Sequence, residues 1–270
     1  MSQVLPEYDI GSPVECKLWK PSRNDTYFIK TADQRYILRI YQVQSRSLSD
    51  IHYELDLLNY LERKKNSISV PIARRDGSFI HPLPAPEGMR YAVLFTYAEG
   101  HRGPYPLEEA YSVIYGRALA EIHAGLDDFS SQHKRFQLHL DYLLDTPLQT
   151  ILPLLENRPA DSAYLRQLVD LLKTSLMSLP LTELEYGVCH GDSHGGNAHV
   201  TQDHKVTFFD FDDCGEGWRA FDLATFRWNL AINKQDDNIW DAFLQGYRQR
   251  RAIREIDLTA IPCTKKMIGG

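Results

Sequence analysis

The spacing of apolar residues changes near residue 100, and this change limits the fold more than any other feature of the sequence. Before it, β-branched and aromatic residues gather in short runs separated by turn residues, which predicts an antiparallel meander. These runs occupy residues 14–20, 26–31 and 36–41. After it, apolar residues recur every three or four positions over 107–122 and 161–179, which predicts long helices. The sequence therefore predicts an α+β fold with a boundary within residues 98–104.

Local signals predict the remaining elements. An apolar face predicts a helix over 50–65, with Ser49 or Asp50 as its N-cap. A hairpin at the Asp76-Gly77 turn, a proline-rich loop over 82–88 and the apolar run 91–97 complete a sheet of about five strands. Short β runs are expected at 186–189, 198–200 and 206–211, and further helices at 220–233 and 237–250.

Composition and charge exclude several classes of protein. The net charge of −6 argues against a protein that neutralises nucleic-acid phosphates. The sequence has neither an apolar run of membrane-spanning length nor the basic-then-apolar start of a signal peptide. Its four cysteines are scattered singly without a CxxC pair, which is typical neither of a zinc site nor of a disulfide framework. We therefore expect a cytoplasmic protein without nucleic-acid or membrane partners.

The densest group of reactive side chains is the polar segment 190–197, which reads His-Gly-Asp-Ser-His-Gly-Gly-Asn. It lies between two β runs, and Asp210 follows Asn197 by thirteen residues, where a third run ends. Loops rich in Asp, Asn and Gly are commonly plain turns. Here the flanking β runs predict a hairpin that places Asp192, Asn197 and Asp210 at one end of a small ribbon.

These three residue types match what phosphoryl transfer from ATP requires. One carboxylate accepts or orients the hydroxyl proton of the acceptor, while an amide oxygen and a second carboxylate hold Mg²⁺ against the phosphates. The gap of five residues from Asp192 to Asn197 equals the spacing in the catalytic loop of protein kinases. Imidazole and carboxylate groups of the same segments also suit a metal-dependent hydrolase, which remains an alternative.

Segments 190–197 and 209–213 together resemble the Brenner-type motif of the aminoglycoside phosphotransferase and choline kinase-like family, a branch of the protein-kinase-like fold. The pattern over 209–224 is most similar to the homoserine kinase-like and stress-response kinase branch. The resemblance implies a two-lobed fold with ATP between the lobes. The N-terminal nucleotide-binding lobe, 1–97, would be an antiparallel sheet plus a helix. The mainly helical C-terminal lobe, 98–270, would carry the catalytic and metal-binding loops.

The resemblance also implies roles for individual residues of the second lobe. Asp192 would be the catalytic base, and His190 would orient the catalytic loop. Asn197 and Asp210 would be the Mg²⁺ ligands. Asp222, in the segment 221–224, matches a buried aspartate that braces the catalytic loop in the family.

In the first lobe, the resemblance implies nucleotide contacts from Arg39, Glu54, Ser22, Asn24, Thr96 and Ala98. Arg39 would reach the phosphates and pair with Glu54, where many members of the family have Lys instead of Arg. An ordinary surface ion pair is the alternative. Ser22 and Asn24 would cover the phosphates from a hairpin turn, for which a plain solvent turn is the alternative. Thr96 and Ala98 fall where the family's hinge bonds adenine through backbone groups.

The function implied is that of a kinase, an ATP-dependent phosphotransferase that moves the γ-phosphoryl group to a hydroxyl of a small molecule. Amino alcohols and aminoglycosides are the acceptor classes favoured, and GTP is an alternative donor. A nucleotide-binding pseudokinase and a protein Ser/Thr kinase remain alternative functions. The pseudokinase is motivated by residues 261–270, which lack another amphipathic period. A substrate wall would then be missing, or supplied by a second subunit in a homodimer.

Overall fold

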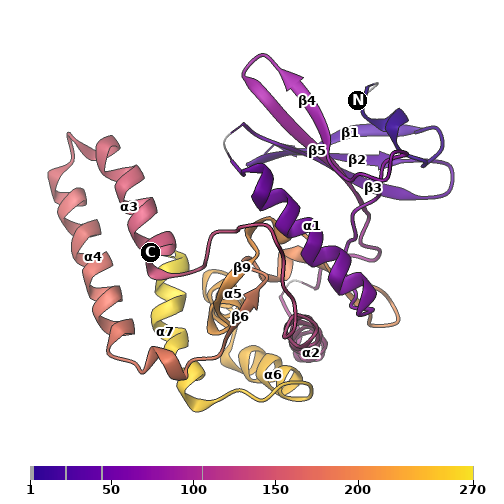
Figure 1. Cartoon of the computed structure of the whole chain (residues 1–270). Coiled ribbons are helices and arrows are strands. Elements are labelled where there is room, and N and C mark those ends of the chain that lie inside the picture. The colour runs from indigo at the N-terminus through magenta and orange to yellow at the C-terminus, as the bar shows by residue number, and fades with distance from the viewer. Residues whose placement is uncertain (1–2, 22, 44, 105, 270) are drawn as a thin grey trace. The chain divides into compact units, whose positions relative to one another are not determined.

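The fold is seen in a computed structural model that describes residues 3–21, 23–43, 45–104 and 106–269 (Figure 1). An antiparallel sheet comes first in the chain and helices dominate the remainder, so the predicted α+β fold is confirmed. The chain forms two compact units, each assembled from separate segments. The first unit contains Met1–Gly100, Ser130–Lys134 and Thr207–Phe209, and the second contains His101–Phe129, Arg135–Val206 and Asp210–Gly270.

The first unit is built on a five-stranded antiparallel sheet with the order β1-β2-β3-β5-β4. The strands are β1 (Glu15–Pro21), β2 (Asn24–Lys30), β3 (Arg35–Tyr41), β4 (His81–Ala85) and β5 (Gly88–Thr96). Alternate residues of β3, Tyr36, Leu38 and Ile40, are buried in one core cluster with Val4 and Tyr8, which flank the short helix η1 (Leu5–Glu7). Alternate residues of this strand therefore lie on the buried face of the sheet.

Helix α1 (Leu48–Arg63) belongs to the same unit and buries Ile51, Leu55 and Leu58, as its apolar spacing predicts. Its predicted N-cap, Ser49 or Asp50, is wrong. Ser47 is the cap, because its extended backbone lets Oγ accept from the N–H of Asp50 at 3.1 Å. The Asp50 carboxylate accepts from the N–H of Ser47 at 2.9 Å, which completes a capping box.

The proline-rich segment over 82–88 is not the predicted loop. Its first part is strand β4, which contains Pro82 and Pro84 and pairs with β5. β4 lies at the edge of the sheet and has one neighbour, so a strand that lacks some N–H donors can still be accommodated there. The prolines therefore mark an edge strand.

The second unit is mainly helical. Its helices are α2 (Glu109–Gly125), η2 (Asp141–Asp145), α3 (Thr146–Ile151), η3 (Leu152–Leu155), α4 (Pro159–Met177), η4 (Leu181–Glu183), η5 (Gly195–Asn197), η6 (Phe211–Asp213), α5 (Ala220–Ile232), α6 (Asp237–Arg248) and α7 (Glu255–Gly269). Helix α2 packs against α6, and α5 packs against α7 (Figure 1). No helix in the described part of the chain is both long enough and apolar enough to cross a bilayer.

Short strands connect the helices of this region. β6 (Tyr186–Cys189) pairs antiparallel with β9 (Gly215–Trp218), and β7 (Ala198–Val200) and β8 (Val206–Phe208) form a hairpin. β8 ends at Phe208, before the predicted end at 211, because residues 211–213 turn into η6.

The C-terminal segment also differs from the prediction, because α7 extends through residues that lack an obvious amphipathic period. Its buried positions include Asp257, Ala260, Ile261 and Thr264. Polar and small side chains on the packed face conceal the helix from a pattern based on large apolar residues.

Candidate active site

The segment 190–197 is the predicted catalytic loop, and the buried carboxylate of Asp222 fixes its first residues. After β6 ends at Cys189, the backbone N–H groups of His190 and Gly191 donate to Asp222 Oδ2 and Oδ1, at 2.7 and 2.9 Å. The Ser193 hydroxyl donates to the backbone carbonyl of Asp222 at 2.8 Å. Asp222 lies in the first turn of α5 and is fully buried. The bracing role implied for Asp222 is therefore confirmed.

Two further buried residues orient Asp222. His123 Nε2 lies 2.8 Å from Asp222 Oδ2, and the Tyr247 hydroxyl lies 2.6 Å from His123 Nδ1. Burial lowers the pKa of His123. Burial opposes ionisation of Asp222, but the hydrogen bonds from His123 and from the backbone of His190 help to bring the pKa of Asp222 below its ordinary value. With Asp222 ionised, Nε2–H of His123 donates to it, and Tyr247 donates to Nδ1.

Neither His123 nor Tyr247 was predicted from the sequence as a functional residue. His123 follows Leu119 by four positions, which places it near the apolar face of the predicted helix. A histidine at such a position is a signal of a buried polar contact, although spacing alone does not identify its partner. Tyr247 gave no comparable signal.

Gly191 allows the catalytic loop to pack closely against the segment that follows Asp210. Its φ of +85° lies in the left-handed region, and a Cβ at this position would lie 1.9 Å from the carbonyl oxygen of Asp213. Any side chain would collide with that backbone, so the two loops can be this close only with glycine here.

Asp192 and Asn197, which the sequence predicts to converge, are in direct contact. The Asn197 amide nitrogen donates to the Asp192 carboxylate at 2.8 Å and to the Asp192 carbonyl at 2.9 Å. With its nitrogen committed to Asp192, the side chain of Asn197 presents its oxygen, Oδ1, as the atom suited to a metal. The gap of five residues is spanned by η5, whose single turn returns the chain toward Asp192.

The pKa of Asp192 reflects the groups around it. Burial raises this pKa above its ordinary value, the charges of His194 and His190 oppose the rise, and the carboxylates of Asp213 and Asp210 add to it. Asp210 is therefore within electrostatic range of Asp192, so the structure brings the three predicted residues into one neighbourhood.

Two histidines, His190 and His194, contact the same loop. His190 is fully buried, its Nδ1 accepts from the N–H of Asp192 at 3.2 Å, and its ring packs on Phe211 with centroids 4.2 Å apart. His194 Nδ1 accepts from the N–H of Gly196 at 2.9 Å, while Nε2 lies 3.6 Å from Asp192 Oδ2. Burial lowers the pKa of His194. Both rings therefore accept hydrogen bonds from backbone N–H groups of the loop that contains Asp192.

Asp210 follows β8 in a left-handed conformation, with φ 65° and ψ 56°, and its side chain is exposed. Such a conformation is uncommon for a residue other than glycine and is found more often at functional sites.

The donor atoms of Asn197 and Asp210 fit a magnesium ion. Both side chains offer oxygen, and Mg²⁺ is usually held by one or two carboxylates with water and substrate phosphates. Within the described residues, no group of three or more His, Cys, Asp and Glu side chains is arranged to hold a metal. The amide oxygen of Asn197 and the carboxylate of Asp210 would need further oxygens, which phosphate groups can supply.

The first unit contains the residues predicted for the nucleotide. Arg39 on β3 and Glu54 on α1 are 7% and 0% exposed, and Arg39 Nη1 lies 2.7 Å from Glu54 Oε1. The Tyr41 hydroxyl donates to Glu54 Oε2 at 2.9 Å, and the Arg39 guanidinium lies 4.9 Å from the centre of the Phe95 ring. The pair is thus buried, which excludes the alternative of a surface ion pair.

The other four predicted nucleotide contacts are placed as follows. Ser22 lies outside the described residues, and Asn24 is buried at the start of β2. Thr96 uses its backbone within the unit: its carbonyl accepts from the Ser69 hydroxyl at 2.6 Å and its N–H donates to the Val70 carbonyl at 2.9 Å. Ala98 is buried just after β5 ends.

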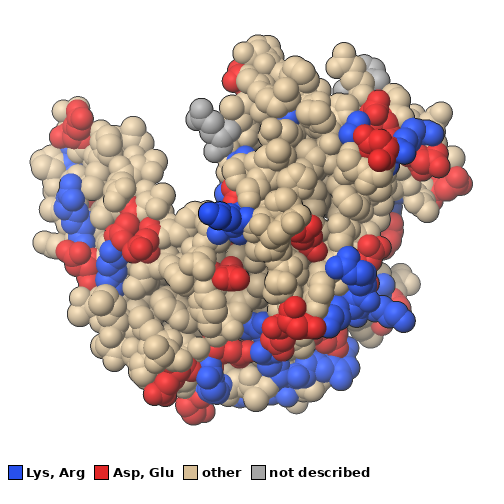
Figure 2. Space-filling view, in the orientation of Figure 1, with Lys and Arg blue, Asp and Glu red and all other residues tan. Residues whose placement is uncertain are grey.

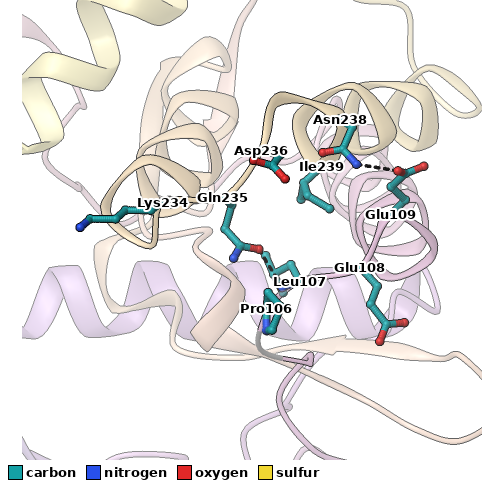
Figure 3. Close-up of a pocket in the computed structure, with 9 residues that line it drawn as sticks. All are labelled: Pro106, Leu107, Glu108, Glu109, Lys234, Gln235, Asp236, Asn238 and Ile239. Atoms are coloured by element: carbon teal, nitrogen blue, oxygen red, sulfur yellow. Dashed lines mark hydrogen bonds between the residues drawn. The ribbon is translucent and has the colours of Figure 1, made fainter.

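The second unit also contains a polar pocket of about 470 Å³ that the sequence did not indicate (Figure 3). The Gln235 side chain accepts from the N–H of Leu107 at 2.7 Å, and the Asn238 amide donates to Glu109 at 2.6 Å. The pocket is lined by Pro106, Leu107, Glu108, Glu109, Lys234, Gln235, Asp236, Asn238 and Ile239. None of these residues belongs to the predicted site.

Residues 17–257 match the pattern of the phosphotransferase enzyme family. An uncharacterised protein of Synechocystis sp. is 39% identical over 247 residues, which cover 90% of this chain and 68% of that protein. The homoserine kinase of Neisseria meningitidis serogroup B is 25% identical over 270 residues, covering 98% of this chain and 84% of the relative.

Solved structures share the fold. A microcompartment-associated aminopropanol kinase superimposes with a TM-score of 0.80 and 24% identity, over 98% of this chain and 84% of its own. An amicoumacin kinase, solved in complex with AMP-PNP, Ca²⁺ and Ami, gives a TM-score of 0.81 and 22% identity, over 99% of this chain and 85% of its own. The predicted fold is confirmed by these similarities.

Proposed function

The chain belongs to the phosphotransferase enzyme family, and on this premise we propose that it transfers the γ-phosphoryl group of ATP to a hydroxyl group of a small amino alcohol. The observation that carries the proposal is the contact of Asn197 with Asp192 at 2.8 Å, with Asp210 in electrostatic range. A base and two metal-ligating oxygens are the parts that phosphoryl transfer requires, and they lie together in the second unit.

Asp192 is assigned to the acceptor hydroxyl. Its carboxylate would accept the hydroxyl proton, or orient that hydroxyl toward the phosphorus atom. The hydrogen bond from Asn197 fixes one carboxylate oxygen, and the other remains for the acceptor. The N–H groups of His190 and Gly191 donate to Asp222. These bonds fix the backbone just before Asp192 and therefore the direction in which its side chain leaves the backbone.

Asn197 and Asp210 are assigned to Mg²⁺. When bound, the ion neutralises charge on the phosphates and helps to orient them. Asn197 would contribute Oδ1, because its nitrogen donates to Asp192. Asp210 would contribute a carboxylate oxygen from the start of η6.

Nucleotide binding is assigned to the N-terminal lobe, residues 1–97, together with Ala98. Arg39 would contact the phosphates, and Glu54 would hold the guanidinium in place through the bond at 2.7 Å. Many members of the family have Lys at this position. The planar guanidinium of Arg39 carries the same positive charge and can donate to two separate phosphate oxygens. Thr96 and Ala98 are assigned to the backbone contacts with adenine, and the Thr96 N–H donates to the Val70 carbonyl.

The acceptor class rests on charge and on the relatives. Asp213 is half-buried next to Gly191, and its charge acts on Asp192. Glu216 is exposed two residues after Cys214. The negative charge of Asp213 near Asp192 favours an acceptor with an ammonium group, and Glu216 adds a second carboxylate on β9. A homoserine kinase and an aminopropanol kinase are among the similar proteins, and both names describe amino alcohols.

A panel of acceptors tests the proposal. The purified chain is incubated with γ-labelled ATP, Mg²⁺ and amino alcohols, aminoglycosides or neutral alcohols, and transfer of the label is measured. We expect the amino alcohols to be phosphorylated most efficiently. Asp192→Asn should reduce turnover by about 10²- to 10⁴-fold, while Asp241→Asn, an exposed carboxylate on α6, should not.

Two outcomes would contradict the proposal. Nucleotide binding without transfer to any member of the panel would favour a pseudokinase. Undiminished turnover by a folded Asp192→Asn variant would remove Asp192 from the role of base.

A further inference from the structure

The backbone conformation changes sharply along the loop 210–214, which follows β8. Asp210 is left-handed, residues 211–213 make a single 3₁₀ turn, and Cys214 is already extended toward β9. The turn is closed by a backbone hydrogen bond from the N–H of Cys214 to the carbonyl of Phe211, at 2.9 Å. A left-handed residue other than glycine persists when surrounding contacts fix the backbone around it. Contacts from outside the loop are therefore important for the direction of the Asp210 side chain.

Arg135 supplies such contacts. Its Nε donates to the carbonyl of Cys214 at 2.7 Å, and its Nη2 donates to the carbonyl of Asp212. One guanidinium thus bonds two carbonyls of the same loop, on either side of Asp213. The rigid, planar arrangement of its donors fixes the relative orientation of the two carbonyls.

Arg135 is itself held in place. Its guanidinium lies 4.3 Å from the centre of the Phe136 ring, and that ring stacks on Tyr142 with centroids 4.2 Å apart. Three residues later, the N–H of Leu138 donates to the carbonyl of Glu216 at 2.7 Å. The segment that carries Arg135 is therefore anchored to β9, the strand into which the loop leads.

We infer that Arg135 is a positioning residue that holds the 210–214 loop in the conformation in which Asp210 binds the metal. The inference rests on the proposed function, because it gives Asp210 the role of a metal ligand. Arg135 acts through the backbone of Asp212 and Cys214 and does not touch the reacting groups. Residues that orient metal ligands from outside typically change metal affinity or activity by about 10- to 100-fold when they are replaced.

The expected effect is specific to the guanidinium. Arg135→Ala removes both donors, whereas Arg135→Lys keeps the charge but cannot reproduce the planar fork between the two carbonyls. Both variants should weaken metal binding. Arg166 on α4 is exposed and provides the matched control as Arg166→Ala.

Binding of Mn²⁺ to the full chain tests the inference independently of turnover. Free Mn²⁺ is measured by electron paramagnetic resonance in the presence of AMP-PNP, and thermal unfolding is recorded without metal. We expect the Mn²⁺ dissociation constant to rise by about tenfold or more in Arg135→Ala and Arg135→Lys, and not in Arg166→Ala. If Arg135→Ala fails to fold, Arg135→Lys alone decides.

The results separate this inference from the proposed function. Wild-type affinity for Mn²⁺ in folded Arg135→Lys would overturn the role of Arg135. Absence of Mn²⁺ binding by the wild-type chain would overturn it together with the assignment of Asp210. Normal Mn²⁺ binding without phosphoryl transfer would contradict only the proposed function. Where turnover is present, the half-saturating Mg²⁺ concentration should rise in both variants.

Discussion

Asp222 Oδ2 lies 2.7 Å from the backbone nitrogen of His190, although the two residues are 32 positions apart in the sequence. The bond connects the first turn of α5 to the first residue of the catalytic loop. Asp222 also accepts from Gly191 and His123, so one ionised side chain orders both the loop and the helix α2 that carries His123. The geometry of Asp192 is thus set by a group that does not contact it.

Replacement of Asp222 should destabilise the protein. Asp222→Ala leaves two buried N–H groups and the His123 ring without their acceptor, and we expect the free energy of unfolding to fall by about 3–5 kcal/mol. Urea denaturation at pH 7 measures the change, with the exposed Asp241→Asn as control. A loss of less than 1 kcal/mol would show that the buried network contributes little.

Gly191→Ala and Gly77→Ala separate backbone strain from collision. Both glycines have similar positive φ angles, +85° and +83°, but only Gly191 would place a Cβ 1.9 Å from a backbone oxygen, whereas nothing lies within 4 Å at Gly77. Gly77→Ala should cost about 1–2 kcal/mol of stability through its backbone conformation alone. Gly191→Ala should cost more and should also reduce turnover, because the loops around Asp192 must separate. Equal stability of the two variants would contradict the close approach.

Activity should fall at acidic pH as Asp192 becomes protonated. Its pKa is raised above the ordinary value of 3.8, chiefly by burial and in addition by Asp213 and Asp210. Because Asp192 must be ionised to accept a proton, kcat/KM should be lost as the pH falls through this raised pKa. Asp213→Asn removes one of the negative charges and should move the acidic limb of the profile to lower pH. A profile that does not move in Asp213→Asn would argue that another group controls it.

Arg39 should affect nucleotide binding more than its neighbour on the same strand. Arg39→Gln should raise KM for ATP by about tenfold or more, equivalent to at least about 1.4 kcal/mol of binding energy. It should also lower thermal stability, because Glu54 remains buried without its partner. Arg39→Lys should recover most of both losses. Arg35→Gln is the control, since Arg35 is exposed and pairs with Glu99. An unchanged KM in Arg39→Gln would assign the pair to stability alone.

Much of the site could be predicted because its residues are close in sequence. Asp192 and Asn197 are joined by one short turn, and Asp210 follows the next hairpin, so local spacing was sufficient to bring them together. The Arg39–Glu54 pair came from the family resemblance, and its burial became visible only in the fold.

The contacts that were missed connect segments far apart in the chain. Arg135 donates to the backbone carbonyls of Asp212 and Cys214. Every residue has a backbone carbonyl, so the sequence does not indicate which of them an arginine will bond. Tyr247 contacts His123 because α6 packs on α2. The periodicity of each helix does not show which helices pack together. The proline-rich strand β4 was missed because the cost of proline depends on whether a strand lies at an edge.

The segmented make-up of the first unit has a consequence for its synthesis on the ribosome. The N–H of Ser69 donates to the carbonyl of Phe208 at 2.8 Å, and the Ser131 hydroxyl donates to Asp56 at 2.6 Å. These bonds cannot form until residues 131 and 208 have left the exit tunnel. The first unit therefore lacks these bonds while most of the polypeptide is translated, and its folding ends late although its sequence begins early.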